Sequence, residues 1–158
     1  MFRFKKFGRL TDGELSLVID EYLHGRRAME AVPAYKFKII RNKDQQWVGD
    51  IDVRIGITEN LYLFGGQIGY GIHPQYRGKG YAGKSCLIIR QVALSHGVDE
   101  LWITCNPENI ASRKTCVAIG AKHVDTVDIP PTNELYARGD RKKCRYYWPL
   151  HQVNSDIA

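Results

Sequence analysis

The sequence predicts a single α/β (α+β) domain with a mixed, mostly antiparallel sheet, a central parallel β-α-β unit and helices on both faces. Strand-like segments outnumber helical ones, and a strand, a glycine-rich turn, a helix and a second strand follow one another over residues 66–105. Such a unit favours a right-handed parallel crossover. The 158 residues suffice for one hydrophobic core, so we expect one domain over residues 1–150 and a frayed tail at 151–158.

The N-terminal part is predicted to form a strand followed by a helix. Aromatic and basic residues nearly alternate over residues 2–7, which is typical of a strand. Thr11 and Glu14 have the spacing of a helix capping box, and apolar residues then recur at helical intervals. We therefore expect an amphipathic helix over residues 11–23, stopped by Gly25.

Three strands are expected next. Extended patterns over residues 35–39 and 47–57 flank a turn-forming segment at 42–44, so the two strands should form a hairpin. Residues 66–73 continue as a strand, which Pro74 ends, and their glycines suggest a bulge or a close approach of a ligand to the backbone.

The second half of the chain alternates helices with strands, because apolar residues there recur first at helical and then at strand spacing. Glycines follow both helices, as at many helix C-termini. The expected elements are a helix at 80–96, a strand at 101–105, a helix at 109–119, a strand at 123–127, a loop at 129–140 and a strand at 144–148.

Composition is that of a folded globular protein, with 44% hydrophobic and 25% charged residues. No apolar run approaches the roughly 20 residues that cross a bilayer, and no signal peptide is visible, so we expect a cytoplasmic protein without a membrane partner. The cysteines form no C-x-x-C pair, so we expect reduced thiols and no metal site. They are Cys86, Cys105, Cys116 and Cys144.

The net charge of +6 is compatible with a polyanionic partner. The basic residues are scattered, however, except for a cluster over residues 138–145 followed by aromatic residues. Alternation along a strand should turn those aromatic side chains inward and the charges outward, to form a solvated face. We therefore do not expect nucleic acid as a partner.

The segment most informative about function is Gln75-Tyr76-Arg77-Gly78-Lys79-Gly80-Tyr81-Ala82, a basic, glycine-rich turn before a helix. Such a turn directs backbone N–H groups outward at the positive end of a helix dipole, which suits a pyrophosphate. A plain strand-to-helix turn also uses glycines, so the turn alone leaves both interpretations open.

The same segment also fits a P-loop, because Gly78 to Ser85 reads G-x-x-x-x-G-K-S. A nucleotide-hydrolysing site needs a second strand ending in Asp to hold Mg²⁺, and the strand at 101–105 has none. A P-loop helix also begins at the Lys, whereas helical periodicity here begins at Gly80. We therefore rank nucleotide binding low.

Arg77-x-x-Gly80-x-Ala82 resembles the acetyl-CoA pyrophosphate loop of GNAT superfamily N-acetyltransferases, in which Arg or Gln, two residues, Gly, one residue and Gly or Ala follow one another. Asn109 to Ser112, followed by Ile119-Gly120-Ala121, is similar to the second signature of that family. The element order matches the family fold over nearly the whole chain. Residues 66–70, 103–105, 109–114 and 145–148 resemble a group of predicted acetyltransferases with undefined substrate.

The resemblance implies acetyl-CoA as cosubstrate, no metal, and direct attack of an amine on the thioester beside a polarising backbone N–H. The amine would belong to a small molecule, a peptide or a protein. Ile72 would offer strand backbone to the pantetheine arm, and Asn109 and Ser112 would touch coenzyme A. The pyrophosphate would be held by Arg77, Gly78, Lys79, Gly80, Tyr81, Ala82 and Gly83.

The catalytic acid and base depart from the family pattern. Members usually carry Tyr seven residues after the Asn, to protonate the departing thiolate, and this chain has Cys116 there. Cys116 is the candidate acid, although a cysteine on an apolar helix face more often packs in a core. Some members have a Glu base where this chain has Thr104. Deprotonation then falls to water or to Tyr70, Glu59 or His73.

A non-catalytic acyl-CoA-binding domain is the principal alternative, because the usual Tyr and Glu are missing. In such folds, the first helix and the loops near residues 58–64 and 130–140 line the acceptor pocket, and they do not identify the amine. Asp125, Asp128 and Glu134 would attract a cationic amine. The resemblance also allows a homodimer formed through the last strands.

Overall fold

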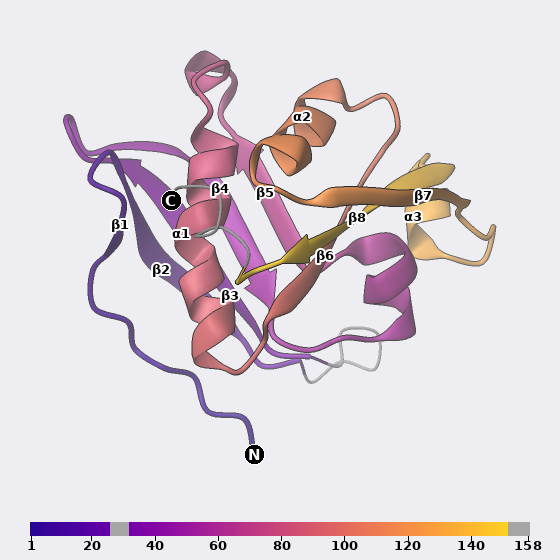
Figure 1. Ribbon diagram of the computed structural model, residues 1–158, viewed down its shortest axis with the longest axis horizontal. Helices are drawn as coiled ribbons and strands as arrows, with labels where there is room; N and C mark the ends of the chain where they lie inside the picture. The colour runs from indigo at the N-terminus through magenta and orange to yellow at the C-terminus, as the bar shows by residue number, and fades with distance from the viewer. Residues whose placement is uncertain (26–31, 152–158) are drawn as a thin grey trace. The chain divides into compact units, whose positions relative to one another are not determined.

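The computed structural model describes residues 1–25 and 32–151 (Figure 1). Contacts divide the chain into two compact units. The first comprises Met1–Ile57 and Ile68–Val98, and the second comprises Thr58–Gln67 and Asp99–Ala158. The predicted frayed tail at 151–158 lies outside the described residues except for His151. The single domain over residues 1–150 stays a prediction.

The first unit contains a five-stranded sheet in the order β1-β2-β3-β4-β5, with every neighbouring pair antiparallel. Helix α1, Tyr81–Ser95, packs against this sheet (Figure 1). A short 3₁₀ turn, η2, Pro74–Tyr76, precedes the helix. The strands are β1, Leu10–Thr11; β2, Leu15–Leu23; β3, Ala34–Arg41; β4, Gln46–Arg54; and β5, Ile68–Ile72.

The predicted helix at 11–23 is wrong, because this segment forms the β1-β2 hairpin. The Thr11 hydroxyl donates to the Leu15 carbonyl at 2.6 Å, and Asp12 Oδ1 accepts from the Leu15 N–H at 2.8 Å. The residues that resembled a helix cap therefore form a turn, since Thr and Asp side chains stabilise both structures. Leu15 and Leu17 are buried at strand spacing, and pairing with β3 decides the outcome.

The predicted strand at 2–7 is also wrong, because these residues adopt no regular structure. Their aromatic rings pack on the sheet instead of alternating along a strand. The Phe4 ring lies 5.1 Å from the Tyr35 ring, and the Lys5 N–H donates to the Tyr35 hydroxyl at 2.8 Å. Side-chain packing thus holds this segment in place.

The core of the first unit lies between α1 and the sheet. Fully buried aliphatic and aromatic side chains there each contribute about 1.5–3 kcal/mol through removal of apolar surface from water. The largest of them are Leu15, Tyr35, Ile39, Val48, Ile51, Val53, Ile89 and Val92.

The second unit contains a three-stranded antiparallel sheet in the order β6-β8-β7. Its core holds the fully buried Trp148, whose indole N–H donates to the Ile119 carbonyl at 3.1 Å. The predicted loop at 129–140 contains a short helix. The elements are η1, a π-helical turn at Leu61–Gly65; β6, Glu100–Cys105; α2, Ile110–Ala118; β7, Lys122–Asp128; α3, Glu134–Ala137; and β8, Lys142–Pro149.

The predicted class, α and β elements combined in mostly antiparallel sheets, is confirmed. All ladders of the described strands are antiparallel. The parallel pairing expected between residues 66–73 and 101–105 is not among them and stays a prediction. Within the described part of the chain, no helix has the length and apolar character that crossing a bilayer requires.

Candidate functional site

The glycine-rich turn joins β5 to α1 within the first unit. Gly78 has φ 82° and Gly80 has φ 76°, a left-handed backbone that other L-residues rarely adopt. A Cβ added at either glycine would meet no atom within 4 Å. Backbone conformation, not crowding, therefore favours glycine here, and the space over the turn is open to a ligand.

Helix α1 presents an uncapped N-terminus to this space. Its N-cap is Gly80, no side chain caps the helix, and the first turn contains no acidic residue. The first N–H groups of a helix have no partner within the helix, and the helix dipole adds positive potential there. The helix start is thus a ready anion-binding site.

Two exposed basic side chains, Arg77 and Lys79, belong to the turn. The Arg77 Nε donates to the Ile72 carbonyl at 2.9 Å, which holds the start of the turn against the end of β5. Since this carbonyl is engaged, any contact of Ile72 with a pantetheine arm stays a prediction. The exposed cations add to the attraction for a phosphate group.

The P-loop interpretation disagrees with the geometry. Helix α1 begins at Tyr81, so the Lys and Ser of the G-x-x-x-x-G-K-S string lie inside the helix. Lys84 Nζ lies 2.6 Å from a Glu14 carboxylate oxygen, and Ser85 is buried with its hydroxyl donating to the Tyr81 carbonyl at 2.7 Å. A P-loop needs its Lys to reach the phosphates and its Ser hydroxyl to hold Mg²⁺, and here both side chains are engaged with protein atoms instead.

The second predicted signature lies on α2 in the second unit. The Asn109 side chain caps the helix by accepting from the Ser112 N–H at 3.1 Å, and Gly120 follows the helix with φ 92°. Ser112 is buried and hydrogen-bonds the Cys105 thiol. Burial raises the pKa of that thiol, while the Ser112 hydrogen bond lowers it. Both signature residues thus have structural partners, and their contact with coenzyme A stays a prediction.

Cys116, the candidate acid, has a fully buried side chain on α2. A proton donor for a departing thiolate must reach the reacting atoms, and a thiol enclosed by protein cannot do so without a rearrangement. The burial favours the packing interpretation of Cys116.

The other acid-base candidates have varied surroundings. Thr104 donates to the Phe64 carbonyl at 2.7 Å and so fixes the η1 turn. His73 Nδ1 lies 3.1 Å from the Trp47 carbonyl at the end of β5. Tyr70 lies within β5, and Glu59 is exposed just before η1. The first unit therefore brings Ile72 together with residues 77–83, whereas Asn109, Ser112 and Cys116 lie in the second.

Arg145 in β8 corrects the expectation that the basic cluster turns outward. Its side chain is only 4% exposed, and its guanidinium lies 4.5 Å from the Tyr62 ring and 4.7 Å from the Trp102 ring. Nη1 donates to both carboxylate oxygens of Asp125, at 2.9 and 3.0 Å. Cation–π contacts with these two neighbouring rings and the ion pair with Asp125 together compensate the buried charge.

Neighbouring cations of the cluster are also paired. Lys142 lies 2.6 Å from Asp128, and Lys143 lies 3.4 Å from Asp140. The carboxylates of Asp125 and Asp128, which the sequence suggested as attractants for a cationic amine, are thus engaged with basic side chains of the same sheet. Three of the five cations of the cluster are thus compensated, whereas Arg138 and Arg141 are exposed and form no ion pair among the described residues.

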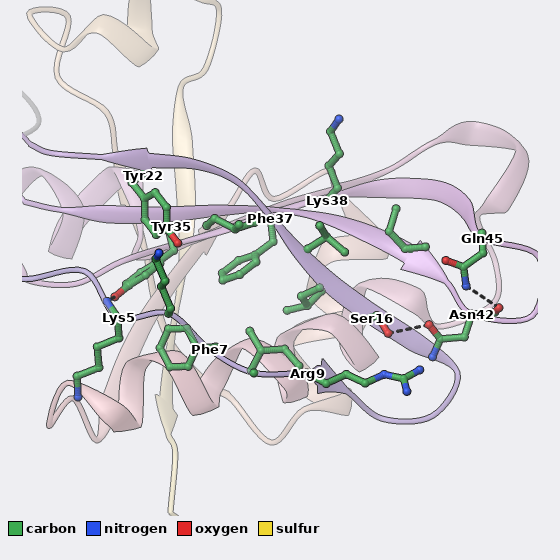
Figure 2. A pocket seen from close by; sticks show the side chains of 17 residues that line it. Lys5, Phe7, Arg9, Ser16, Tyr22, Tyr35, Phe37, Lys38, Asn42 and Gln45 are labelled. Atoms are coloured by element: carbon green, nitrogen blue, oxygen red, sulfur yellow. Dashed lines mark hydrogen bonds between the residues drawn. The ribbon is translucent and has the colours of Figure 1, made fainter.

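The first unit also contains a cavity of about 730 Å³ that the sequence did not suggest. The N-terminal segment forms one wall, with Phe7 and Arg9, and strand β3 supplies Phe37 (Figure 2). Lys38 extends from the opposite side of that strand, away from Phe37 (Figure 2). No periodicity signals this cavity, because it depends on an irregular segment packing beside β2.

A family model described as the acetyltransferase (GNAT) domain matches residues 3–122. No curated protein sequence matches the chain. A GNAT family acetyltransferase from Bacillus anthracis is similar in structure, with 19% identity, a TM-score of 0.57 and coverage of 74% of this chain and 67% of that one.

Two structures from Vibrio cholerae are also similar. One is a proposed ribosomal-protein-serine acetyltransferase, with 16% identity, a TM-score of 0.63 and coverage of 90% of this chain and 97% of that one. The other is a spermidine N-acetyltransferase variant, with 14% identity, a TM-score of 0.59 and coverage of 78% and 69% respectively. Identities this low indicate a shared fold only.

Proposed function

The chain belongs to the GNAT acetyltransferase domain family, and we propose that it is an N-acetyltransferase that transfers an acetyl group from acetyl-CoA to an amine. The observation that carries this proposal is the uncapped start of α1 behind two left-handed glycines, Gly78 and Gly80. The open space over both glycines fits a pyrophosphate, since an added Cβ would meet no protein atom within 4 Å.

In this proposal the N–H groups of residues 78–83 hold the pyrophosphate, and the side chains of Arg77 and Lys79 balance its charge. The Arg77 N–H itself donates to the Pro74 carbonyl at 3.3 Å. The backbone at Ile72 receives the pantetheine arm, and Asn109 and Ser112 contact coenzyme A. The fit is one of charge and backbone geometry, because the turn offers donors and cations and the first turn of α1 contains no acidic residue.

The reaction is a direct transfer. The neutral amine forms a C–N bond with the acetyl carbonyl, the C–S bond breaks, and the thiolate of coenzyme A takes up a proton. Proximity and carbonyl polarisation supply most of the acceleration that such a transfer needs. This mechanism requires no covalent enzyme intermediate and no metal.

The acceptor is an amine of a small molecule, a peptide or a protein. Proteins of the same fold are described as acting on a ribosomal protein and on spermidine. We therefore choose a polyamine and a peptide with a free N-terminus as the first probes. We retain as further predictions a cytoplasmic location, a homodimer, and the absence of membrane and nucleic-acid partners.

A non-catalytic acyl-CoA-binding domain is the second candidate function. The fully buried Cys116 favours it, because this side chain is not accessible as a proton donor at the place where the family usually has Tyr. Release of free coenzyme A in the presence of an amine separates the two functions. Enzyme and binding domain both bind acetyl-CoA, but only the enzyme releases its thiol in proportion to the amine.

The first test is calorimetric titration of the protein with acetyl-CoA and, separately, with ATP and Mg²⁺. We expect acetyl-CoA to bind and ATP not to bind. Binding of ATP without acetyl-CoA would mean that Gly78 to Ser85 is a working P-loop and that the acetyltransferase proposal is wrong.

A further inference from the structure

Asp52 of β4 reaches across to β5, the strand that leads into the glycine-rich turn. Asp52 pairs in register with Gly69, and the Gly69 N–H donates to Asp52 Oδ1 at 3.2 Å. A Cβ added at Gly69 would lie 3.1 Å from Oδ1 and 3.2 Å from Oδ2. The carboxylate thus occupies the space that a side chain of β5 would otherwise fill.

Asp52 lies opposite Gly69 of β5, and this position places it relative to acetyl-CoA bound as proposed above. The inference therefore rests on that proposed function. With the pyrophosphate at the turn and the pantetheine arm along β5, the acetyl end lies toward the start of the strand. Gly69 precedes Ile72 by three residues, or about 10 Å of extended chain. The Asp52 carboxylate therefore lies on the acetyl side of Ile72.

Open space adjoins this carboxylate. Gly71 lies two residues after Gly69 on the same face of β5, and a Cβ added at Gly71 would meet nothing within 4 Å. An amine entering there would find neither a side chain of β5 nor backbone in its way. The two glycines thus leave room for an acceptor beside Asp52.

The contacts of Asp52 are concentrated on one of its carboxylate oxygens. Arg54 Nη1 lies 3.5 Å from Oδ1, and the Gly69 N–H donates to the same oxygen. Lys36 of β3 stands opposite Asp52 in register. Burial raises the pKa of Asp52, although Arg54, the Gly69 N–H and Lys36 each lower it. The net effect is a raised pKa, and a carboxylate with a raised pKa is a stronger base than an exposed one.

We infer that Asp52 is the general base of the proposed reaction, which receives a proton from the acceptor ammonium at Oδ2. The ammonium gives one proton to the carboxylate and becomes a neutral amine, which then attacks the acetyl carbonyl. The second amine proton leaves as the C–S bond breaks and the thiolate is protonated, and Asp52 returns its proton to water.

Asp50 provides a matched control on the same face of the same strand. It pairs in register with Gly71, yet no atom of Asp50 lies within 4 Å of the place of a Gly71 Cβ. Its carboxylate therefore does not reach across to β5. Asp50→Asn removes the same charge from the same face without removing the base.

The test compares wild type, Asp52→Asn and Asp50→Asn for acetyl-CoA binding by calorimetry and for release of free coenzyme A. The amine is whichever of spermidine and an alanine-initiated peptide reacts faster with the wild type. We expect all three proteins to bind acetyl-CoA equally. We expect Asp52→Asn to lose about 100-fold or more in turnover, the usual effect of removing a general base, and Asp50→Asn less than about 3-fold.

Two further readouts distinguish a base from a merely structural residue. The rate should fall as the pH drops through the Asp52 pKa, because only the ionised carboxylate accepts a proton, and this acidic limb should vanish in Asp52→Asn. Since burial raises the pKa of Asp52, the limb should lie above the pH at which an exposed aspartate titrates. The deficit of Asp52→Asn should shrink with hydroxylamine as acceptor, because this amine is largely unprotonated at neutral pH.

The outcomes separate this inference from the proposed function. If Asp52→Asn turns over as fast as the wild type and with the same pH profile, Asp52 is not the base, and the proposed function is unaffected. Failure of the wild type to bind acetyl-CoA overturns the proposed function and the inference with it. Binding without turnover of either amine indicates the non-catalytic alternative and likewise rules out a catalytic base.

Discussion

Two basic regions of the chain look alike in sequence and differ in the structure. At the turn over residues 77–83, Arg77 and Lys79 are exposed, and neither takes part in any ion pair found among the described residues. In β8, Lys142, Lys143 and Arg145 each face a carboxylate of the same unit, whereas Arg138 and Arg141 before the strand form no ion pair among the described residues. The comparison teaches that the number of basic residues does not set the uncompensated charge of a region, because neighbouring carboxylates pair the cations of β8 and not those of the turn.

The strongest test of this comparison is Gly80→Asp with Gly97→Asp as its control. The two glycines flank opposite ends of α1, with φ 76° and 77°, and an added Cβ meets nothing within 4 Å at either. Both variants therefore carry a similar backbone strain of about 1 kcal/mol. Only Gly80→Asp places a carboxylate over the N–H groups of the turn.

We expect Gly80→Asp to weaken acetyl-CoA binding by about 100-fold or more, the equivalent of two charge-assisted hydrogen bonds, and Gly97→Asp to leave it unchanged. Calorimetry measures both affinities, and circular dichroism confirms that both variants are folded. Equal affinities for the two variants would remove the basis for the pyrophosphate loop.

The β8 side of the comparison is tested by Arg145→Leu. We expect it to lower the free energy of unfolding by about 2 kcal/mol, less than for a fully buried pair, because Asp125 is 47% exposed and stays near water. Acetyl-CoA affinity should not change. Chemical denaturation gives the stability, and Lys142→Ala, whose ion pair is exposed, should cost less than about 0.5 kcal/mol. A drop in affinity for Arg145→Leu at unchanged stability would contradict the structural role.

A further measurement concerns the exposed cations at the turn. Arg77→Ala and Lys79→Ala should each weaken acetyl-CoA binding about 5-fold at low salt, since each removes one partly screened charge near the pyrophosphate. The loss should shrink as the salt concentration rises. Lys143→Ala, which removes a cation already paired with Asp140, should change the affinity little. Similar losses for all three variants would mean that net charge alone attracts the ligand.

The smallest expected effect is that of Cys116→Ala. Because this thiol is fully buried, we expect packing to dominate, with a stability loss of about 1 kcal/mol and a turnover loss below about 10-fold. Thermal unfolding and the coenzyme A release assay measure the two effects. A turnover loss of about 100-fold with unchanged binding would identify Cys116 as the acid after all.

The sequence predicted the β5-turn-α1 segment well because its determinants are local. Glycines that permit a left-handed backbone and the periodicity that starts a helix lie within a few residues of one another. The prediction of a helix over residues 11–23 failed because its determinants are not local. Its cap-like residues and apolar spacing suit both a helix and a hairpin, and the choice depended on β3, more than ten residues away.

The surroundings of individual side chains were the least predictable feature. Alternation along β8 placed Arg145 outward, yet Tyr62 and Trp102, each distant in sequence, hold it inside. Nothing in the sequence distinguishes Asp52, because a carboxylate on a half-buried strand is common. Its importance comes from a register that sets it opposite a glycine 17 residues later.

By itself, the sequence determined the fold class, the glycine-rich turn that leads into a helix, and the resemblance to GNAT acetyltransferases. These follow from composition, short motifs and the order of elements, all of which are written along the chain. Only the tertiary structure decided that residues 11–23 form a hairpin, that the three cations of β8 are paired with carboxylates, and that Asp52 reaches β5. The physical reason is that burial, ion pairing and strand register depend on neighbours that meet only when distant segments pack together.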